Sequence, residues 1–263
     1  MREVIDNLRE FLLCLKSLSI AESADLGNGN FCVATGIKSA TENWVFYDSA
    51  DFNSKIISSV KSFFYDRELK YIWPILNYNG NFRLLEDEGL RLGGGIIGMK
   101  FNIALKDANA NYLNSLNKVR FNLYFEILDA GSGEAEIDDW ARTAWQGFDG
   151  KRTPKKFLAM ARELAGNNKI KLVKAILNNE SVGTFLLCED AANMGVYYFA
   201  VPPKFRRKRI AAVMMEKVLE LAELAGKDKI VLQATREGEK FYKSFGFEYA
   251  RSPVITLYTN ARY

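Results

Sequence analysis

The chain has 263 residues with 36 basic side chains, 32 acidic side chains and no histidine, which gives a formal net charge of +4. Without histidine there is no Ser-His-Asp or Cys-His triad, no histidine general base and no zinc site that depends on histidine. Any proton transfer must use a carboxylate, a tyrosine, a lysine, a cysteine, a backbone group or water.

Apolar residues make up 48% of the chain, which is enough for a well-buried core. The three cysteines are scattered and form no CxxC motif, which favours a reducing compartment. The apolar run from Phe11 to Leu15 has charged neighbours on both sides, so it indicates an amphipathic helix rather than a signal peptide. No run is long enough to span a bilayer. We predict a cytoplasmic protein that does not contact membranes.

The first half of the chain alternates helix-like and strand-like patterns. The predicted elements are, in order, a helix at 3–18, strands at 30–37 and 43–47, a helix at 52–65, a strand at 70–76, a helix around 82–90, and strands at 96–104 and 119–127. The segment Leu92 to Gly95 reads LGGG without a following Gly-Lys-Ser/Thr, which excludes a nucleotide P-loop and predicts a flexible loop.

A small, polar DAGSG segment at 129–133 suggests a boundary between two domains, 1–128 and 129–263. Up to Leu128 there are 14 basic and 15 acidic residues, a net charge of −1, and the remainder carries +5. The second half also mixes helices with strands, so both halves are α+β. Its predicted elements are a helix at 136–148, a helix that begins at Thr153-Pro154, strands at 170–177, 182–188 and 195–201, a helix at 209–225, a strand at 229–235, a short helix at 237–244 and a final pair of strands.

The most informative segment runs from Gly195 to Phe247. An apolar strand is stopped by Pro202-Pro203, and a basic turn, 204–209, then leads directly into a long amphipathic helix. Such a turn offers unpaired backbone N–H groups and the positive end of the helix dipole to an anion, and arginine suits phosphate oxygens. Taken alone, the turn could also be a solvated cluster of charges.

The order of these elements resembles the GNAT superfamily of acyl-CoA N-acyltransferases. The matching residues are Val201, Pro203, Phe205, Arg206, Lys208, Ile210 and Ala211 in the turn, and Ala234, Thr235, Gly238, Tyr242, Gly246 and Phe247 after it. The resemblance extends more weakly over 134–263. It implies an α/β sandwich with a mixed, mostly antiparallel sheet flanked by helices, and the first half is interpreted as a similar, smaller, degenerate and non-catalytic companion that walls the acceptor cleft.

The resemblance also implies a site for acetyl-CoA as co-substrate, with no metal. The implied binding residues are Phe199, Ala200, Val201, Arg206, Arg207, Lys208, Arg209, Ile210, Ala211, Thr235 and Gly238, and Tyr242 is the implied general acid near the departing sulfur. Arg209 stands where the family usually has glycine. If that position needs a positive φ, a Cβ there weakens cofactor binding, and if it is helical the arginine costs little.

The oxyanion donor is expected to be a backbone N–H near Phe199 or Ala200. The general base is less obvious, because the strand at 196–201 has no carboxylate. Glu189 and Asp190 are the nearest in sequence and could act through water, or they could belong to a solvated hairpin. Trp140, beside two aspartates, could shape a pocket for a cationic amine, or it could be part of the core.

The leading hypothesis is an acetyl-CoA-dependent N-acetyltransferase that moves an acetyl group directly to a primary amine of a small molecule or peptide. The alternative is a catalytically impaired acyl-CoA binding or sensor protein of the same fold. Nucleic-acid binding has little support, because the second half carries a net charge of only +5 and has no longer basic stripe. The sequence does not identify the acceptor, and it leaves the oligomeric state open, with a homodimer as one option.

Overall fold

The computed structural model describes residues 1–49, 53–76, 82–105 and 123–260. Its strands are β1 (Glu22–Gly27), β2 (Asn30–Ala34), β3 (Asn43–Phe46), β4 (Ile72–Ile75), β5 (Arg91–Asn102), β6 (Leu123–Leu128), β7 (Ile170–Leu177), β8 (Glu180–Glu189), β9 (Asn193–Ala200), β10 (Lys229–Ala234) and β11 (Glu248–Thr259). Its α-helices are α1 (Arg2–Lys16), α2 (Ser54–Tyr65), α3 (Phe82–Asp87), α5 (Glu134–Gly147), α6 (Lys155–Ala165), α7 (Ile210–Leu224) and α8 (Arg236–Ser244). None of these helices is long and apolar enough to cross a membrane.

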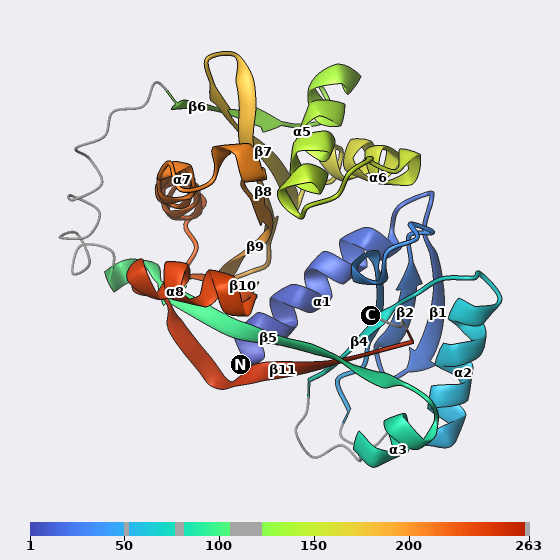
Figure 1. Ribbon diagram of the computed structural model, residues 1–263. Helices are drawn as coiled ribbons and strands as arrows, with labels where there is room; N and C mark the ends of the chain where they lie inside the picture. Colours follow the sequence, from blue (N-terminus) through green and yellow to red (C-terminus); the bar gives the residue numbers. More distant parts are fainter. Residues whose placement is uncertain (50–52, 77–81, 106–122, 261–263) are drawn as a thin grey trace.

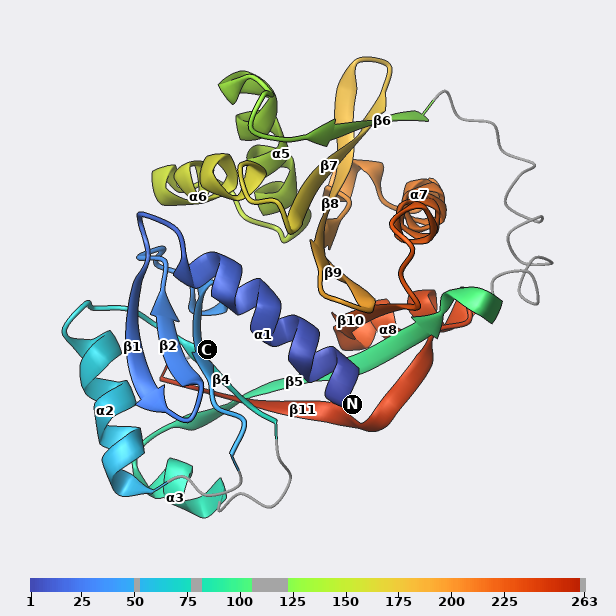
Figure 2. The same cartoon turned by 180° about the vertical axis from the view of Figure 1, so that it is seen from behind.

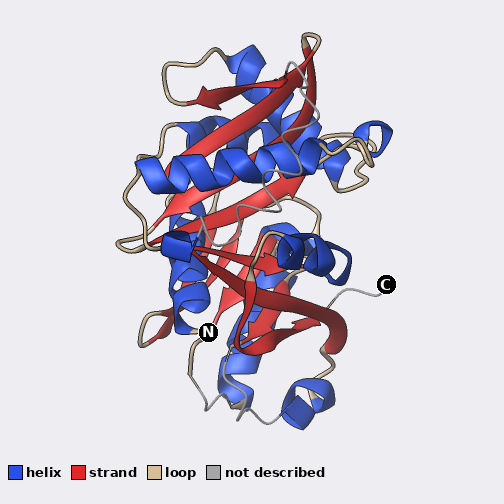
Figure 3. Cartoon of the chain, turned by 90° about the vertical axis from the view of Figure 1, so that its left-hand side faces the viewer, coloured by secondary structure: helices blue, strands red, loops and turns tan. Residues whose placement is uncertain are grey.

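The strands described form one sheet of eleven, in the order β1-β2-β3-β4-β11-β5-β10-β9-β8-β7-β6 (Figures 1 and 2). Neighbouring strands are antiparallel except for two parallel pairs, β3 with β4 and β9 with β10. Helices flank the sheet, as the side view shows (Figure 3). The predicted mixed, mostly antiparallel sheet with flanking helices is confirmed.

The helices divide the core into layers. One apolar cluster joins α1, α5 and α6 to one face of the sheet and includes Phe11, Trp140 and Phe157. A second cluster joins α7 and α8 to the opposite face and includes Met214 and Tyr242. A third lies under α2 and α3. The buried side chains of α1 recur at helical spacing and form one apolar face, which packs in the same cluster as α5 and α6 of the second half. This face includes Val4, Ile5, Leu8, Phe11, Leu12 and Leu15.

The two halves of the chain exchange strands at the centre of the sheet. Strand β5, from the first half, lies between β11 and β10 and pairs antiparallel with both. Strand β11, from the second half, lies between β5 and β4. Each half therefore completes the sheet of the other, and separating them would expose unpaired strand edges.

Three local predictions are corrected by the structure, and one strand was not predicted. The LGGG segment is part of strand β5 rather than a loop, and Gly94 takes a φ of +126° within the strand. The final pair of strands is one strand, β11, whose pairing with β5 shifts register between Tyr249 and Val254. Helix α6 begins one residue later than predicted, with Pro154 as its N-cap. Strand β1 was missed, because its side chains are mostly exposed and give no apolar alternation.

Candidate functional site

The parallel strands β9 and β10 separate part of the way along their length. Their pairing ends at Val196 with Leu232, although β9 continues to Ala200 and β10 to Ala234. On its other side β9 pairs with β8 through a bulge, since Leu186 faces Tyr197 and Thr184 faces Ala200. Tyr198, inside the bulge, has a φ of +45°. The bulge interrupts the regular ladder and leaves backbone groups of β9 beside the opening between the strands.

The basic turn after β9 contains a run of unpaired backbone N–H groups. Among the described residues, the N–H groups of 207–211 have no hydrogen-bond partner. Arg207 and Arg209 both have a φ of +61°, and Arg209 is the N-cap of α7. Successive N–H groups in a turn with left-handed residues, followed by a helix N-terminus, are suited to bind an anion.

The side chains of the turn divide into two groups. Arg206 lies at the surface, where it donates hydrogen bonds to Val201 O at 3.0 Å and to Gly147 O at 2.8 Å, and forms an ion pair with Asp149. Lys204 forms an ion pair with Glu180. The remaining three are exposed and form no ion pair with a described residue: Arg207, Lys208 and Arg209. These three side chains and the N–H groups of 207–211 form an exposed cationic surface, whereas Arg206 anchors the turn to the end of α5.

The conformation of Arg209 decides between the two alternatives left by the sequence. Its φ of +61° and ψ of 8° place it in the left-handed region, where glycine is unstrained and a residue with a Cβ is not. The arginine therefore holds a strained backbone at the position where the anion site is formed.

Replacing Arg209 by glycine should stabilise the protein by roughly 0.5 to 1 kcal/mol, because the strain is removed and only part of the gain is lost to the more flexible unfolded chain. In a chain of this size we expect a melting temperature about 2 °C higher. Lys208, whose φ is not positive, provides the control. Lys208→Gly should destabilise, and a lower melting temperature for Arg209→Gly would contradict the assigned strain.

Tyr242 and Phe199 pack together on the face of the sheet that α7 and α8 cover. Tyr242 is 9% exposed, and its ring contacts Phe199, with 6.1 Å between centroids, and Phe247 at 5.6 Å. Burial raises the pKa of Tyr242 above its ordinary value, so the phenol stays protonated at neutral pH. No hydrogen-bond partner of its hydroxyl is found among the described residues, so the hydroxyl is available to a ligand.

The other predicted binding residues hold the frame of the site. Thr235 is the N-cap of α8 and accepts a hydrogen bond from the N–H of Gly238 at 3.2 Å. A Cβ at Gly238 would lie 3.2 Å from the Tyr242 ring, so the glycine lets that ring pack closely. Ile210 and Ala200 are buried, and Ala211 is partly buried. The structure thus brings the strand, turn and α8 residues to one end of the β9–β10 pair.

Three residues predicted near the acceptor lie elsewhere or serve the fold. Glu189 forms ion pairs with Lys171 and Lys227; burial raises its pKa, but these pairs outweigh burial and the pKa is lowered overall. Asp190 accepts hydrogen bonds from two backbone N–H groups of the β8–β9 hairpin, far along β9 from the bulge. Trp140 is fully buried, and its indole donates to Phe185 O at 3.3 Å.

One carboxylate at the bulge was not predicted from the sequence. Glu42, from the short 3₁₀ turn η1 (Ala40–Glu42), accepts a hydrogen bond from the hydroxyl of Tyr198 at 2.6 Å. Burial raises the pKa of Glu42 to about 7, although the hydrogen bonds from Tyr198 and Thr41 oppose the shift. The two residues are 156 positions apart, so no local pattern could have linked them.

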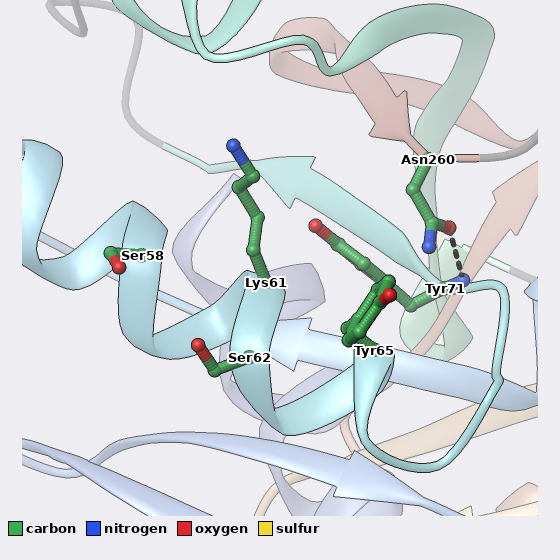
Figure 4. A pocket seen from close by; sticks show the side chains of 6 residues that line it. All are labelled: Ser58, Lys61, Ser62, Tyr65, Tyr71 and Asn260. Atoms are coloured by element: carbon green, nitrogen blue, oxygen red, sulfur yellow. Dashed lines mark hydrogen bonds between the residues drawn. The ribbon is translucent and has the colours of Figure 1, made fainter.

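A separate cavity of about 300 Å³ lies against α2, lined by residues of the first half and by Asn260. It is lined by Ser58, Lys61, Ser62, Tyr65, Tyr71 and Asn260 (Figure 4). The hydroxyl of Tyr71 is buried and has no hydrogen-bond partner among the described residues, and Asn260 accepts from the N–H of Tyr71 at 3.0 Å. None of the predicted site residues lines this cavity, so it is distinct from the opening between β9 and β10.

Part of the chain matches a known domain family, and the whole chain shares its fold with known proteins. Residues 136–256 match the family model of the acetyltransferase (GNAT) domain. The whole chain resembles a GCN5-related N-acetyltransferase from Kribbella flavida, with a TM-score of 0.68, 11% identity, and 99% of this chain and 96% of that one covered. It also resembles a tandem GNAT protein from the clavulanic acid biosynthesis pathway, with a TM-score of 0.64, 8% identity, and coverage of 98% and 94%. Among curated proteins, none matches the sequence.

Residues 136–256 of this chain are a GNAT domain, and with the first half the chain has the fold of a tandem GNAT protein. The resemblance seen in the turn residues is thereby confirmed.

Proposed function

We propose that the protein is an N-acetyltransferase that moves an acetyl group directly from acetyl-CoA to a primary amine. The observation that carries the proposal is the run of unpaired N–H groups at 207–211, placed at the end of strands that separate beside it. The turn and its exposed Arg207, Lys208 and Arg209 would hold the pyrophosphate, and the free edge of β9 would pair with the pantetheine arm.

Direct transfer requires an oxyanion donor and a group that stabilises the departing thiolate. A backbone N–H of the bulge, near Phe199, is suited to the first role. Tyr242 is suited to the second, because its hydroxyl stays protonated and can donate a hydrogen bond to the sulfur. The pKa of Tyr242 lies above that of a thiol, so Tyr242 stabilises the thiolate by donating a hydrogen bond and keeps its own proton. Water can then supply the proton that converts the thiolate to the thiol.

Tyr242→Phe should lower kcat about 100-fold and leave the Kd of acetyl-CoA nearly unchanged, because the lost hydroxyl acts on the developing charge rather than on binding. The measurement is release of free CoA thiol with a panel of amines, together with acetyl-CoA binding. Tyr249→Phe, at an exposed side chain of β11, is the control and should behave like the wild type. Unchanged turnover in Tyr242→Phe would remove the tyrosine from the mechanism.

A second candidate is an acyl-CoA binding or sensor protein with impaired catalysis. It is favoured by the strained Arg209 at the anion site and by the absence of a carboxylate on β9. Acetyl transfer to any amine of the panel would count against it, whereas tight acetyl-CoA binding without transfer would favour it.

The proposed setting is the cytoplasm, where the thiols of Cys14, Cys32 and Cys188 would stay reduced, as they are in the structure. We retain 1–128 and 129–263 as proposed domains, although β5 and β11 cross between them in the sheet. The acceptor is a small-molecule or peptide amine in this proposal.

A further inference from the structure

Glu42 is an unpaired carboxylate held inside the molecule. It is 5% exposed and forms no ion pair with any lysine or arginine of the described chain. The groups that face it are the hydroxyls of Tyr198, from β9, and of Thr41, from its own turn. Lys156 of α6 lies over Gly36 in the same loop and does not pair with it. A buried charge without a counter-ion is unfavourable, so its retention calls for an explanation beyond packing.

Tyr198 connects this carboxylate to the candidate site. It lies in the β9 bulge, one residue before Phe199, and its backbone is held in the left-handed region. Strained backbone of this kind persists only where the surrounding structure enforces it, and it gathers at functional sites. The strain directs the phenol toward Glu42, on the α1, α5 and α6 face, whereas Phe199 packs with Tyr242 on the face of α7 and α8.

Aromatic rings surround Tyr198 on its face of the sheet. Its ring makes edge contacts with four others, at centroid distances between 5.6 and 6.4 Å: Phe11, Trp140, Phe148 and Phe157. Phe148 is 57% exposed, so this cluster reaches the surface. Aromatic faces next to a carboxylate attract a cationic amine. Phe11 and Glu42 belong to the first half, so both halves form this cluster.

We propose that Tyr198 and Glu42 form a proton relay that accepts the proton of the attacking amine, so that the first half contributes to the chemistry of the second. This inference rests on the proposed function. As the C–N bond forms, the amine proton passes to the Tyr198 oxygen while the phenol proton passes to Glu42. The C–S bond breaks with its electron pair on sulfur, and the thiolate then takes a proton from water. A carboxyl group whose pKa is near 7 suits this role at neutral pH.

The test compares wild type with Glu42→Gln and Tyr198→Phe, using acetyl-CoA and the best substrate among spermidine, kanamycin, lysine and an alanine-terminated peptide. Glutamine keeps the size of the side chain and the hydrogen bond from Tyr198, so the fold is preserved. Both variants should lower kcat/KM at pH 7 by about 100-fold. In the wild type, log kcat/KM should rise with pH below about pH 7 and rise one unit of slope less steeply above it. The profile of Glu42→Gln should not show this change of slope near pH 7.

The matched control is Glu86→Gln, because Glu86 also accepts a hydrogen bond from a tyrosine hydroxyl, that of Tyr258 at 3.1 Å, away from the opening. Its activity and pH profile should be those of wild type. If Glu42→Gln keeps wild-type activity and a wild-type pH profile, the relay is overturned while the transferase function stands. The same holds if Tyr198→Phe remains active and Glu42→Gln does not. If wild type binds acetyl-CoA and transfers nothing to any amine, the proposed function fails and the relay fails with it.

Discussion

Glu42→Gln should make the protein about 3 kcal/mol more stable than wild type at pH 8 and only about 1 kcal/mol more stable at pH 5. Burial raises the pKa of Glu42 from its ordinary value of 4.5 to about 7 in the folded protein. Between these values the folded state binds more protons than the unfolded state, so stability from this group is present below pH 4.5 and is lost as pH rises through 7. A neutral glutamine avoids the ionisation of a buried group and its cost.

Urea denaturation of both proteins at pH 5 and pH 8 measures this effect, and the difference between variant and wild type cancels the titration of all other groups. Glu86→Gln serves again as control, since Glu86 is exposed. A Glu42→Gln protein that is no more stable than wild type at pH 8 would show that Glu42 is not an uncompensated buried carboxylate. This result does not depend on any enzymatic activity.

Gly195→Ala should destabilise the protein by roughly 3 to 4 kcal/mol, because a methyl group there would overlap a locked side chain. The added Cβ would lie 1.7 Å from Asn7 Oδ1 and 2.7 Å from the Tyr197 ring. Asn7 is fully buried; its amide group donates to Cys188 O and to Asp190, and its oxygen accepts from the hydroxyl of Tyr197 at 3.0 Å. The side chain cannot turn away without leaving buried polar groups unpaired.

Gly166→Ala is the matched control, since its new Cβ would make only an ordinary contact of 3.4 Å and its φ is −82°. We expect it to be neutral or slightly stabilising, because it is compatible with alanine and lowers the entropy of the unfolded chain. Thermal melts of the two variants measure the contrast. Equal melting temperatures would mean that α1 is not fixed to β9 through Asn7.

The sequence predicted those parts of the site that are contiguous in the chain. About thirty residues contain the strand before Pro202, the basic turn and the apolar face of α7. The spacing of apolar residues and the local composition were therefore sufficient to predict them. The conformation of Arg209 was not predictable, since the sequence pattern does not show whether this position is helical or is held in the left-handed region despite the strain. The role of Arg206 was also hidden, because its partners Gly147 and Asp149 come from a different helix end.

Features that depend on contacts between the halves could not be predicted from local patterns. The LGGG segment looks like a loop, and it becomes a strand only because β10 and β11 pair with it on both sides. Glu42 looks like an ordinary residue of a polar turn until Tyr198 covers it from the other half. In both cases tertiary pairing overrides local propensity.

The most direct measurement of the central claim, that this fold binds acetyl-CoA at the 207–211 turn, is a thermal-shift titration with acetyl-CoA, free CoA and ATP. Ligand that binds the folded state at 100 times its Kd adds about 2.7 kcal/mol of stability, a rise of several degrees in melting temperature. We expect this rise with acetyl-CoA and with CoA, a smaller one with ATP, and a weaker response to both CoA species in Lys208→Glu. No stabilisation by either CoA species at millimolar concentration would contradict the account.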